Sequence, residues 1–89
     1  MKDNNNMKTL PKNFDDLSQY DKILTLLNMA FDYPMEYKVL PLSKLWSVDR
    51  NIAENILNQT TESSTEQEYN KVIMSSILDL VKNNLAVSK

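Results

Sequence analysis

Apolar side chains recur every three or four residues along much of the chain, the spacing of one face of an α-helix. The first such stretch predicts a helix over 13–32, and its N-cap is either Asn13 or Ser18, since each precedes an aspartate by three residues. Pro34 disfavours helical geometry in the residue before it, so this helix is expected to end near Asp32. Its inward stripe consists of Leu17, Tyr20, Ile23, Leu24, Leu27 and Phe31.

The middle of the chain predicts two short helices, over 41–46 and 48–58. Pro41 suits the first turn of a helix, where its missing N–H removes no hydrogen bond. Either Ser47 or Asp49 can cap the second helix. Both helices have an inward apolar face, formed by Leu42, Leu45 and Trp46 in the first and by Val48, Ile52, Ala53, Ile56 and Leu57 in the second.

A long last helix is predicted over 64–86, after a loop rich in threonine and serine. Three overlapping capping boxes precede it, pairing Ser63 with Glu66, Ser64 with Gln67 and Thr65 with Glu68. Its apolar stripe is wide enough to bury against more than one neighbour, so residues 66–85 either complete the core or form a dimer seam. The stripe consists of Tyr69, Val72, Ile73, Ile77, Leu80, Val81 and Leu85, broadened by Met74 and Leu78.

The predicted fold is therefore an all-α bundle of about four helices. A length of 89 residues with 42% hydrophobic content fits one domain, expected over 13–89. Residues 1–12 are polar and aperiodic, and we expect them to form a flexible N-terminal arm.

The amino-acid composition excludes most of the common catalytic mechanisms. The chain has no cysteine and no histidine, so it lacks the commonest metal ligands and general base. It also has no glycine, which phosphate-cradling and dinucleotide-binding loops require. We expect no catalytic residue, cofactor or metal, and thus not an enzyme. No apolar run approaches the roughly 20 residues that span a bilayer, so we expect a cytoplasmic location. An alternative for the last helix is insertion into a membrane surface, but such helices usually have many basic residues on their polar face. This one has Lys71 and Lys82 among acidic and neutral groups, so we expect no membrane contact.

Residues 39–58 resemble the DNA-binding helix-turn-helix, with apolar Leu42 before a small residue, small Ser47 at the turn, and an inward Ala53 and Ile56. The resemblance implies that the second helix enters the major groove of double-stranded DNA. It further implies a small DNA-binding transcriptional regulator, which would act as a homodimer because paired half-sites double the contacts.

If the resemblance holds, the helix period turns the polar side of 48–58 outward, where arginine and asparagine can bind base edges. Two lysines would hold phosphates. The DNA-binding residues implied in this way are Lys38, Lys44, Arg50, Asn51, Asn55 and Asn58.

The alternative is a non-enzymatic protein-interaction module, such as a mobile-element or phage-type inhibitor or adaptor that binds a host regulatory protein. A formal charge of −2 gives no global attraction for DNA and favours this hypothesis. The aromatic segment 31–46 is either core or interface. A continuous positive strip joining Lys38, Lys44 and Arg50 would favour DNA, whereas a bare apolar patch would favour a protein partner.

Overall fold

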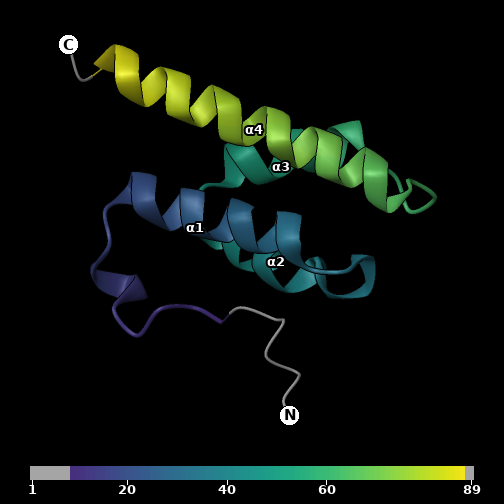
Figure 1. The fold of residues 1–89 in the computed structure, drawn as a ribbon, viewed down its shortest axis with the longest axis horizontal. Helices are drawn as coiled ribbons and strands as arrows, with labels where there is room; N and C mark the ends of the chain where they lie inside the picture. Colours follow the sequence, from purple (N-terminus) through teal and green to yellow (C-terminus); the bar gives the residue numbers. More distant parts are fainter. Residues whose placement is uncertain (1–8, 88–89) are drawn as a thin grey trace.

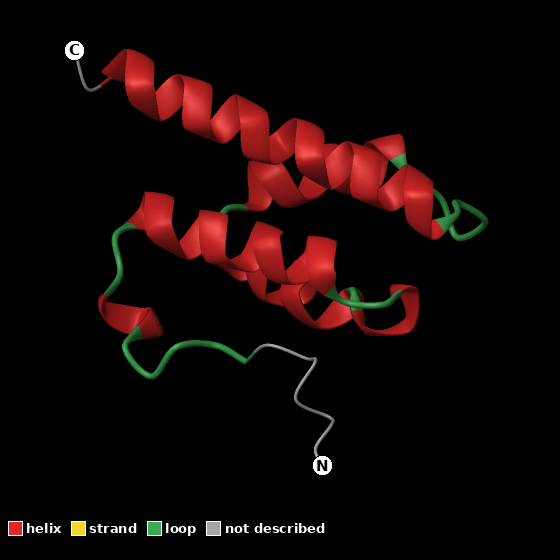
Figure 2. Cartoon of the chain, viewed as in Figure 1, coloured by secondary structure: helices red, strands yellow, loops and turns green. Residues whose placement is uncertain are grey.

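The computed structural model describes residues 9–87 and contains four α-helices in that range (Figure 1). They are α1 (Gln19–Asp32), α2 (Val39–Val48), α3 (Arg50–Gln59) and α4 (Glu66–Val87). Two short 3-10 helices, η2 (Phe14–Asp16) and η3 (Met35–Tyr37), precede α1 and α2. The described part of the chain has no strand (Figure 2), and the predicted all-α bundle of about four helices is confirmed.

The helices form a ring of contacts. Helix α1 packs against α2 and α4, and α3 packs against the same two helices. Figure 1 shows α1 and α4 running side by side in opposite directions. Since α4 has 22 residues and α1 has 14, α4 is longer by roughly 12 Å, and it extends past α1 at both ends, further at its own N-terminal end (Figure 1).

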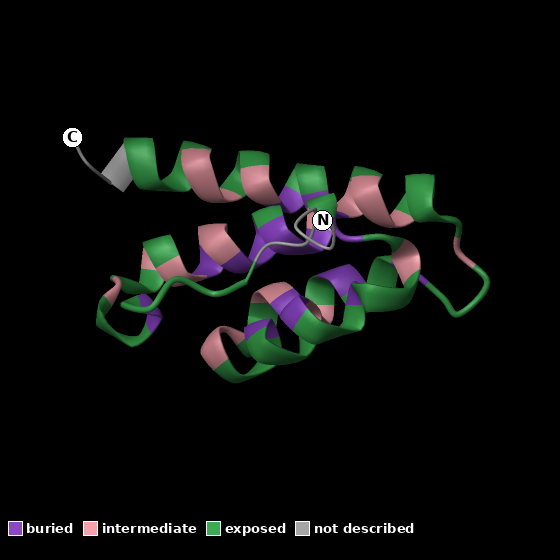
Figure 3. Cartoon of the chain, turned by 60° about the horizontal axis from the view of Figure 1, so that its bottom comes forward, coloured by how far each residue is buried: buried purple, intermediate pink, exposed green. Residues whose placement is uncertain are grey.

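The core lies inside this ring, where the buried faces of the helices meet (Figure 3). Each fully buried leucine or isoleucine contributes about 2 kcal/mol to folding, so these side chains dominate the stability of the bundle. The core residues are Phe14, Ile23, Leu26, Leu27, Ala30, Leu45, Ala53, Ile56 and Ile73.

The predicted helix over 13–32 is in fact two helices. The chain is extended at Leu17 and Ser18, between η2 and α1. Ser18 Oγ accepts a 3.1 Å hydrogen bond from Asp21 N, so Ser18 is the N-cap of α1. Asn13 makes no side-chain capping bond. The break lets the chain turn back and bury Phe14 in the core.

Helices α2 and α3 differ from their predicted bounds by one or two residues at each end. Pro41 lies in the first turn of α2, as expected, but the helix starts at Val39. Of the two candidate caps for α3, Asp49 is correct, because its Oδ1 accepts a 3.3 Å bond from Ile52 N. Ser47 Oγ instead donates to the carbonyl of Lys44. Asp49 alone, in an extended conformation, separates the two helices.

One of the three candidate capping boxes begins α4. Thr65 Oγ1 accepts a 3.2 Å bond from Glu68 N, and Glu68 Oε1 accepts a 2.7 Å bond from Thr65 N. The helix therefore starts at Glu66, two residues later than predicted, and reaches Val87. The expected flexible arm over 1–12 lies outside the described residues except for positions 9–12.

Candidate functional site

The polar face of α3 is open to solvent. Asn51, Asn55 and Asn58 are exposed on a helix that has its own N-cap and is not continuous with α2. Arg50 is also exposed, with 68% of its side chain accessible, but it has two neighbours. Its Nε lies 3.7 Å from Glu54 Oε2, and its guanidinium carbon lies 5.1 Å from the centre of the Trp46 ring.

Lys44 is exposed but does not extend a positive surface toward Arg50. Its Nζ lies 5.6 Å from the centre of the Phe14 ring, and Lys22 Nζ lies 6.0 Å from the same ring. Two residues turn an α-helix by about 200°, so Lys44 and Trp46 project from nearly opposite sides of α2. Because Arg50 stacks on Trp46, the two expected DNA contacts are on different sides of this helix.

Lys38 is not on the surface, and the expected phosphate contact is wrong. The residue is 2% exposed, and its Nζ lies at the C-terminal end of α1. There it donates to the carbonyls of Ala30 (2.6 Å) and Tyr33 (2.7 Å), and it is 3.3 Å from that of Phe31. A fourth acceptor, Asn70 Oδ1 on α4, is 2.7 Å away.

This environment follows from the end of α1. The last carbonyls of an α-helix have no partner within the helix and carry its negative dipole end, so a cation there is stabilised. Burial lowers the pKa of the Lys38 amine below its usual 10.5, while Glu66 and Asp32 act to raise it. The only sequence signal of burial was that Lys38 is the one charged residue within the largely apolar run 37–42.

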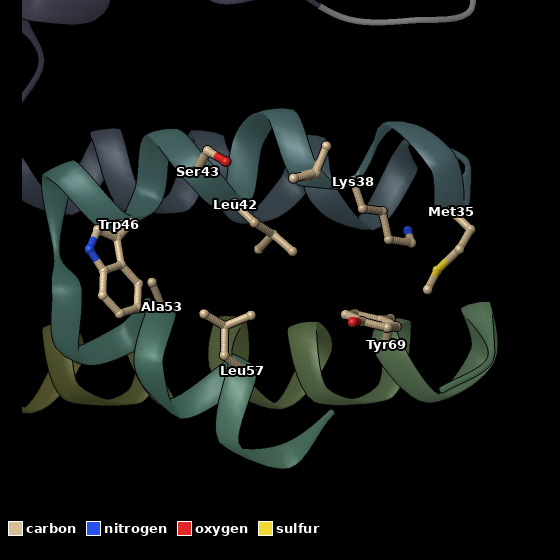
Figure 4. Close-up of a pocket in the computed structure, with 9 residues that line it drawn as sticks. Met35, Lys38, Leu42, Ser43, Trp46, Ala53, Leu57 and Tyr69 are labelled. Carbon is tan, nitrogen blue, oxygen red and sulfur yellow. The ribbon is translucent and has the colours of Figure 1, made fainter. Parts of the chain in front are cut away.

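An apolar groove lies between α2 and α3 and ends at the first turns of α4. We call it the α2–α3 groove. Its volume is about 450 Å³, and it is lined by Met35, Lys38, Val39, Leu42, Ser43, Trp46, Ala53, Leu57 and Tyr69. Figure 4 shows Leu42 and Leu57 pointing toward each other across it, with Trp46 and Ala53 at one end and Met35 and Tyr69 at the other.

The groove exposes large apolar side chains. Val39 is 60% exposed, Leu57 49% and Trp46 38%, whereas Ala53 is buried. Because the side chain of Ala53 is small, it leaves the space between these exposed residues unfilled. Trp46 and Leu57 were expected to face inward, and they instead form the rim. The aromatic segment 31–46 is therefore mixed, with Tyr33 in the core and Tyr37 and Trp46 at the surface.

No protein-family model matches the chain, and neither a curated protein nor a solved structure is significantly similar to it. Within residues 9–87, no three acidic side chains are grouped so that they could hold a metal ion. None of the helices in that range has the length and apolar character needed to cross a membrane.

Proposed function

We propose that the protein is a non-enzymatic interaction module whose α2–α3 groove binds an amphipathic helix of another protein. The observation that carries the proposal is the groove itself, a hollow of about 450 Å³ with three exposed apolar side chains at its rim. Exposed apolar residues gathered around a concavity are typical of sites that bind another protein. A mobile-element or phage-type inhibitor or adaptor that acts on a host regulatory protein in the cytoplasm would use such a site.

The shape of the groove favours a helix as the ligand. Its α2 wall is formed by Val39, Leu42 and Trp46, which repeat at helical spacing over about 10 Å. Grooves of this kind accept apolar side chains at positions i, i+4 and i+7 of a partner helix. The stacked pair of Arg50 and Trp46 lies at one end, and these two residue types are enriched among those that dominate binding energy.

The proposal can be tested with a displayed library of host-encoded peptides, selected against the immobilised protein. Selected peptides should share the i, i+4, i+7 apolar pattern and shift the fluorescence of Trp46, the only tryptophan in the chain. They should bind Leu57→Glu at least tenfold more weakly, because a carboxylate would lie in the groove. Leu78→Glu, on the outer side of α4, is the matched control and should bind normally. Peptides that bind both variants equally well would reject the groove as the site.

A second candidate is a dimeric transcriptional regulator that reads DNA with α3. The exposed polar face of a separately capped helix supports it, because Asn51, Asn55 and Asn58 are open to base edges. Arg50 is 68% exposed and could also reach a base if it left Glu54 and Trp46. Lys44 would contact a phosphate, and dimerisation through 66–85 would pair two half-sites. We rank it second because Glu54 lies beside Arg50 and because one residue links α2 to α3, where helix-turn-helix turns have three or four.

Fluorescence anisotropy with labelled duplexes at low salt tests this second candidate. Arg50→Ala and Asn55→Ala should each reduce specific binding by about 1–3 kcal/mol, whereas Lys44→Ala should weaken binding to all sequences alike. Failure of the protein to bind any duplex at low salt would exclude DNA reading.

A further inference from the structure

A second apolar surface runs along the outer side of α4. Its members are Met74, Leu78, Val81 and Leu85, and we call it the α4 ridge. Leu85 is 61% exposed, Leu78 55% and Met74 37%, and Val81 is half-buried. Steps of four, three and four residues keep all four side chains on one face of the helix. This face was part of the broad stripe noted in the sequence.

The two halves of the ridge have different surroundings. Beside its N-terminal half lies a shallow hollow of about 670 Å³, lined by Phe31 of α1, by Met74 and Leu78 of α4 and by five polar residues of α4 between positions 67 and 75. We call this the Phe31 trough. The C-terminal half contains the exposed Leu85, two residues before the end of α4, and this end of the helix extends slightly past the start of α1 (Figure 1). A hollow thus lies beside one end of the ridge, and the other end lies at the exposed, slightly projecting C-terminal end of α4.

We propose that two copies of the chain pair through their α4 ridges, antiparallel about a point midway between Leu78 and Val81. The 4-3-4 spacing is the same in both directions, so an antiparallel partner matches it. Leu78 then meets the partner's Val81, and Met74 meets the partner's Leu85. The projecting end of each ridge fills the Phe31 trough of the other copy. The contact is the same on both copies and closes as a twofold dimer, the commonest form of oligomer.

The charged side chains on α4 favour a second copy of the chain as the partner, and they favour antiparallel pairing. Asp79 and Lys82 lie on the solvent side of the ridge, one turn apart. Antiparallel pairing brings Lys82 to nearly the same height as the partner's Asp79, and it does so twice because of the twofold axis. Parallel pairing would instead place Lys71 and Lys82 beside their own copies, and like charges at such positions destabilise helix pairs.

The contact is small, with four ridge side chains from each copy. Stable interfaces bury about 800 Å² per partner, and fewer apolar groups give weaker association. We therefore expect a dimer that dissociates at about micromolar concentrations.

Sedimentation equilibrium across micromolar to millimolar protein tests the pairing. The wild type should show a monomer–dimer equilibrium, and Leu78→Glu should weaken it at least 100-fold while leaving the circular dichroism spectrum unchanged. Leu57→Glu is the matched control, since Leu57 and Leu78 are exposed to similar extents, 49% and 55%. It should dimerise as the wild type does. A wild type that stays monomeric at millimolar concentration, or equal behaviour of the two variants, overturns the proposal.

The direction can be tested by cross-linking, because the chain has no cysteine of its own. In the antiparallel dimer, the double variant Met74→Cys, Leu85→Cys should become a covalent dimer with a short bismaleimide. Met74→Cys alone should not, because the two copies of position 74 would be about 16 Å apart. Efficient cross-linking of the single variant would show parallel pairing and refute the antiparallel arrangement. This cross-linking result does not depend on what the α2–α3 groove binds, so the dimer and the groove proposal can fail separately.

Discussion

Lys38 Nζ donates a 2.7 Å hydrogen bond to Asn70 Oδ1, which ties the corner between α1 and α2 to α4. The same amine donates to the carbonyls of Ala30 and Tyr33 at the end of α1. A buried cation without its hydrogen bonds is costly, so these acceptors fix where the chain turns. Because Lys38 also lines the α2–α3 groove, one buried side chain sets the positions of the helices around the candidate site.

Replacing Lys38 by methionine should lower the free energy of unfolding by about 3 kcal/mol, because buried carbonyls would lose a charged donor. Urea denaturation followed by circular dichroism measures the change. Lys44→Met is the control, since Lys44 is exposed, and it should change stability by no more than about 0.5 kcal/mol. Equal effects of the two substitutions would show that the Lys38 hydrogen bonds do not stabilise the fold.

The lowered pKa of Lys38 also predicts a pH dependence of stability. Between that lowered pKa and 10.5, the unfolded chain binds more protons at this position than the folded chain does. The free energy of unfolding contributed by Lys38 should therefore rise with pH through this window. Urea titrations of the wild type and Lys38→Met, from neutral pH to just above 10.5, should show the wild type gaining relative to the variant. A constant or shrinking difference would contradict the prediction.

Asp49 should stabilise the break between α2 and α3, because its side chain caps the N-terminus of α3. Asp49→Ala removes the N-cap of α3 and should cost about 1 kcal/mol of unfolding free energy. Ser47→Ala, the other candidate cap in the sequence, removes only a bond to the Lys44 carbonyl and should cost less. Thermal denaturation of both variants provides the comparison, and a larger loss for Ser47→Ala would reverse the assignment.

Ser76 is a site where stability can be gained. Its Oγ is buried on α4, and no hydrogen-bond partner for it is present in the described part of the chain. Ser76→Ala should raise the free energy of unfolding by about 1 kcal/mol, because an unsatisfied hydroxyl is removed and alanine favours the helix. The exposed neighbour Ser75 is the control, because Ser75→Ala gains only the smaller effect of helix propensity. No difference between the two would indicate that Ser76 finds a partner in solution.

Local signals predicted the helices well, since periodicity and capping act over a few residues. Ser18, Asp49 and the Thr65–Glu68 box were all among the caps that the sequence offered, although it could not choose between neighbouring candidates. The break at Leu17 was missed because only tertiary packing of Phe14 makes it favourable.

The surfaces were less predictable, since they depend on how helices far apart in the sequence meet. Trp46 and Leu57 have the spacing of core residues, but both are exposed and line the groove between α2 and α3. Lys38 looked like a surface lysine because nothing local shows that the end of α1 folds over it.

Tyr69 and Leu78 are nine residues apart on α4, which is two and a half helical turns, so they face opposite directions. The groove that Tyr69 closes therefore stays open when the ridge that contains Leu78 is covered. The proposed dimer would therefore have two identical α2–α3 grooves, each facing away from the dimer contact. A target with two copies of the recognised helix would occupy both grooves of one dimer. The second binding event would then be intramolecular, and its high effective concentration would raise the overall affinity above that of either groove alone.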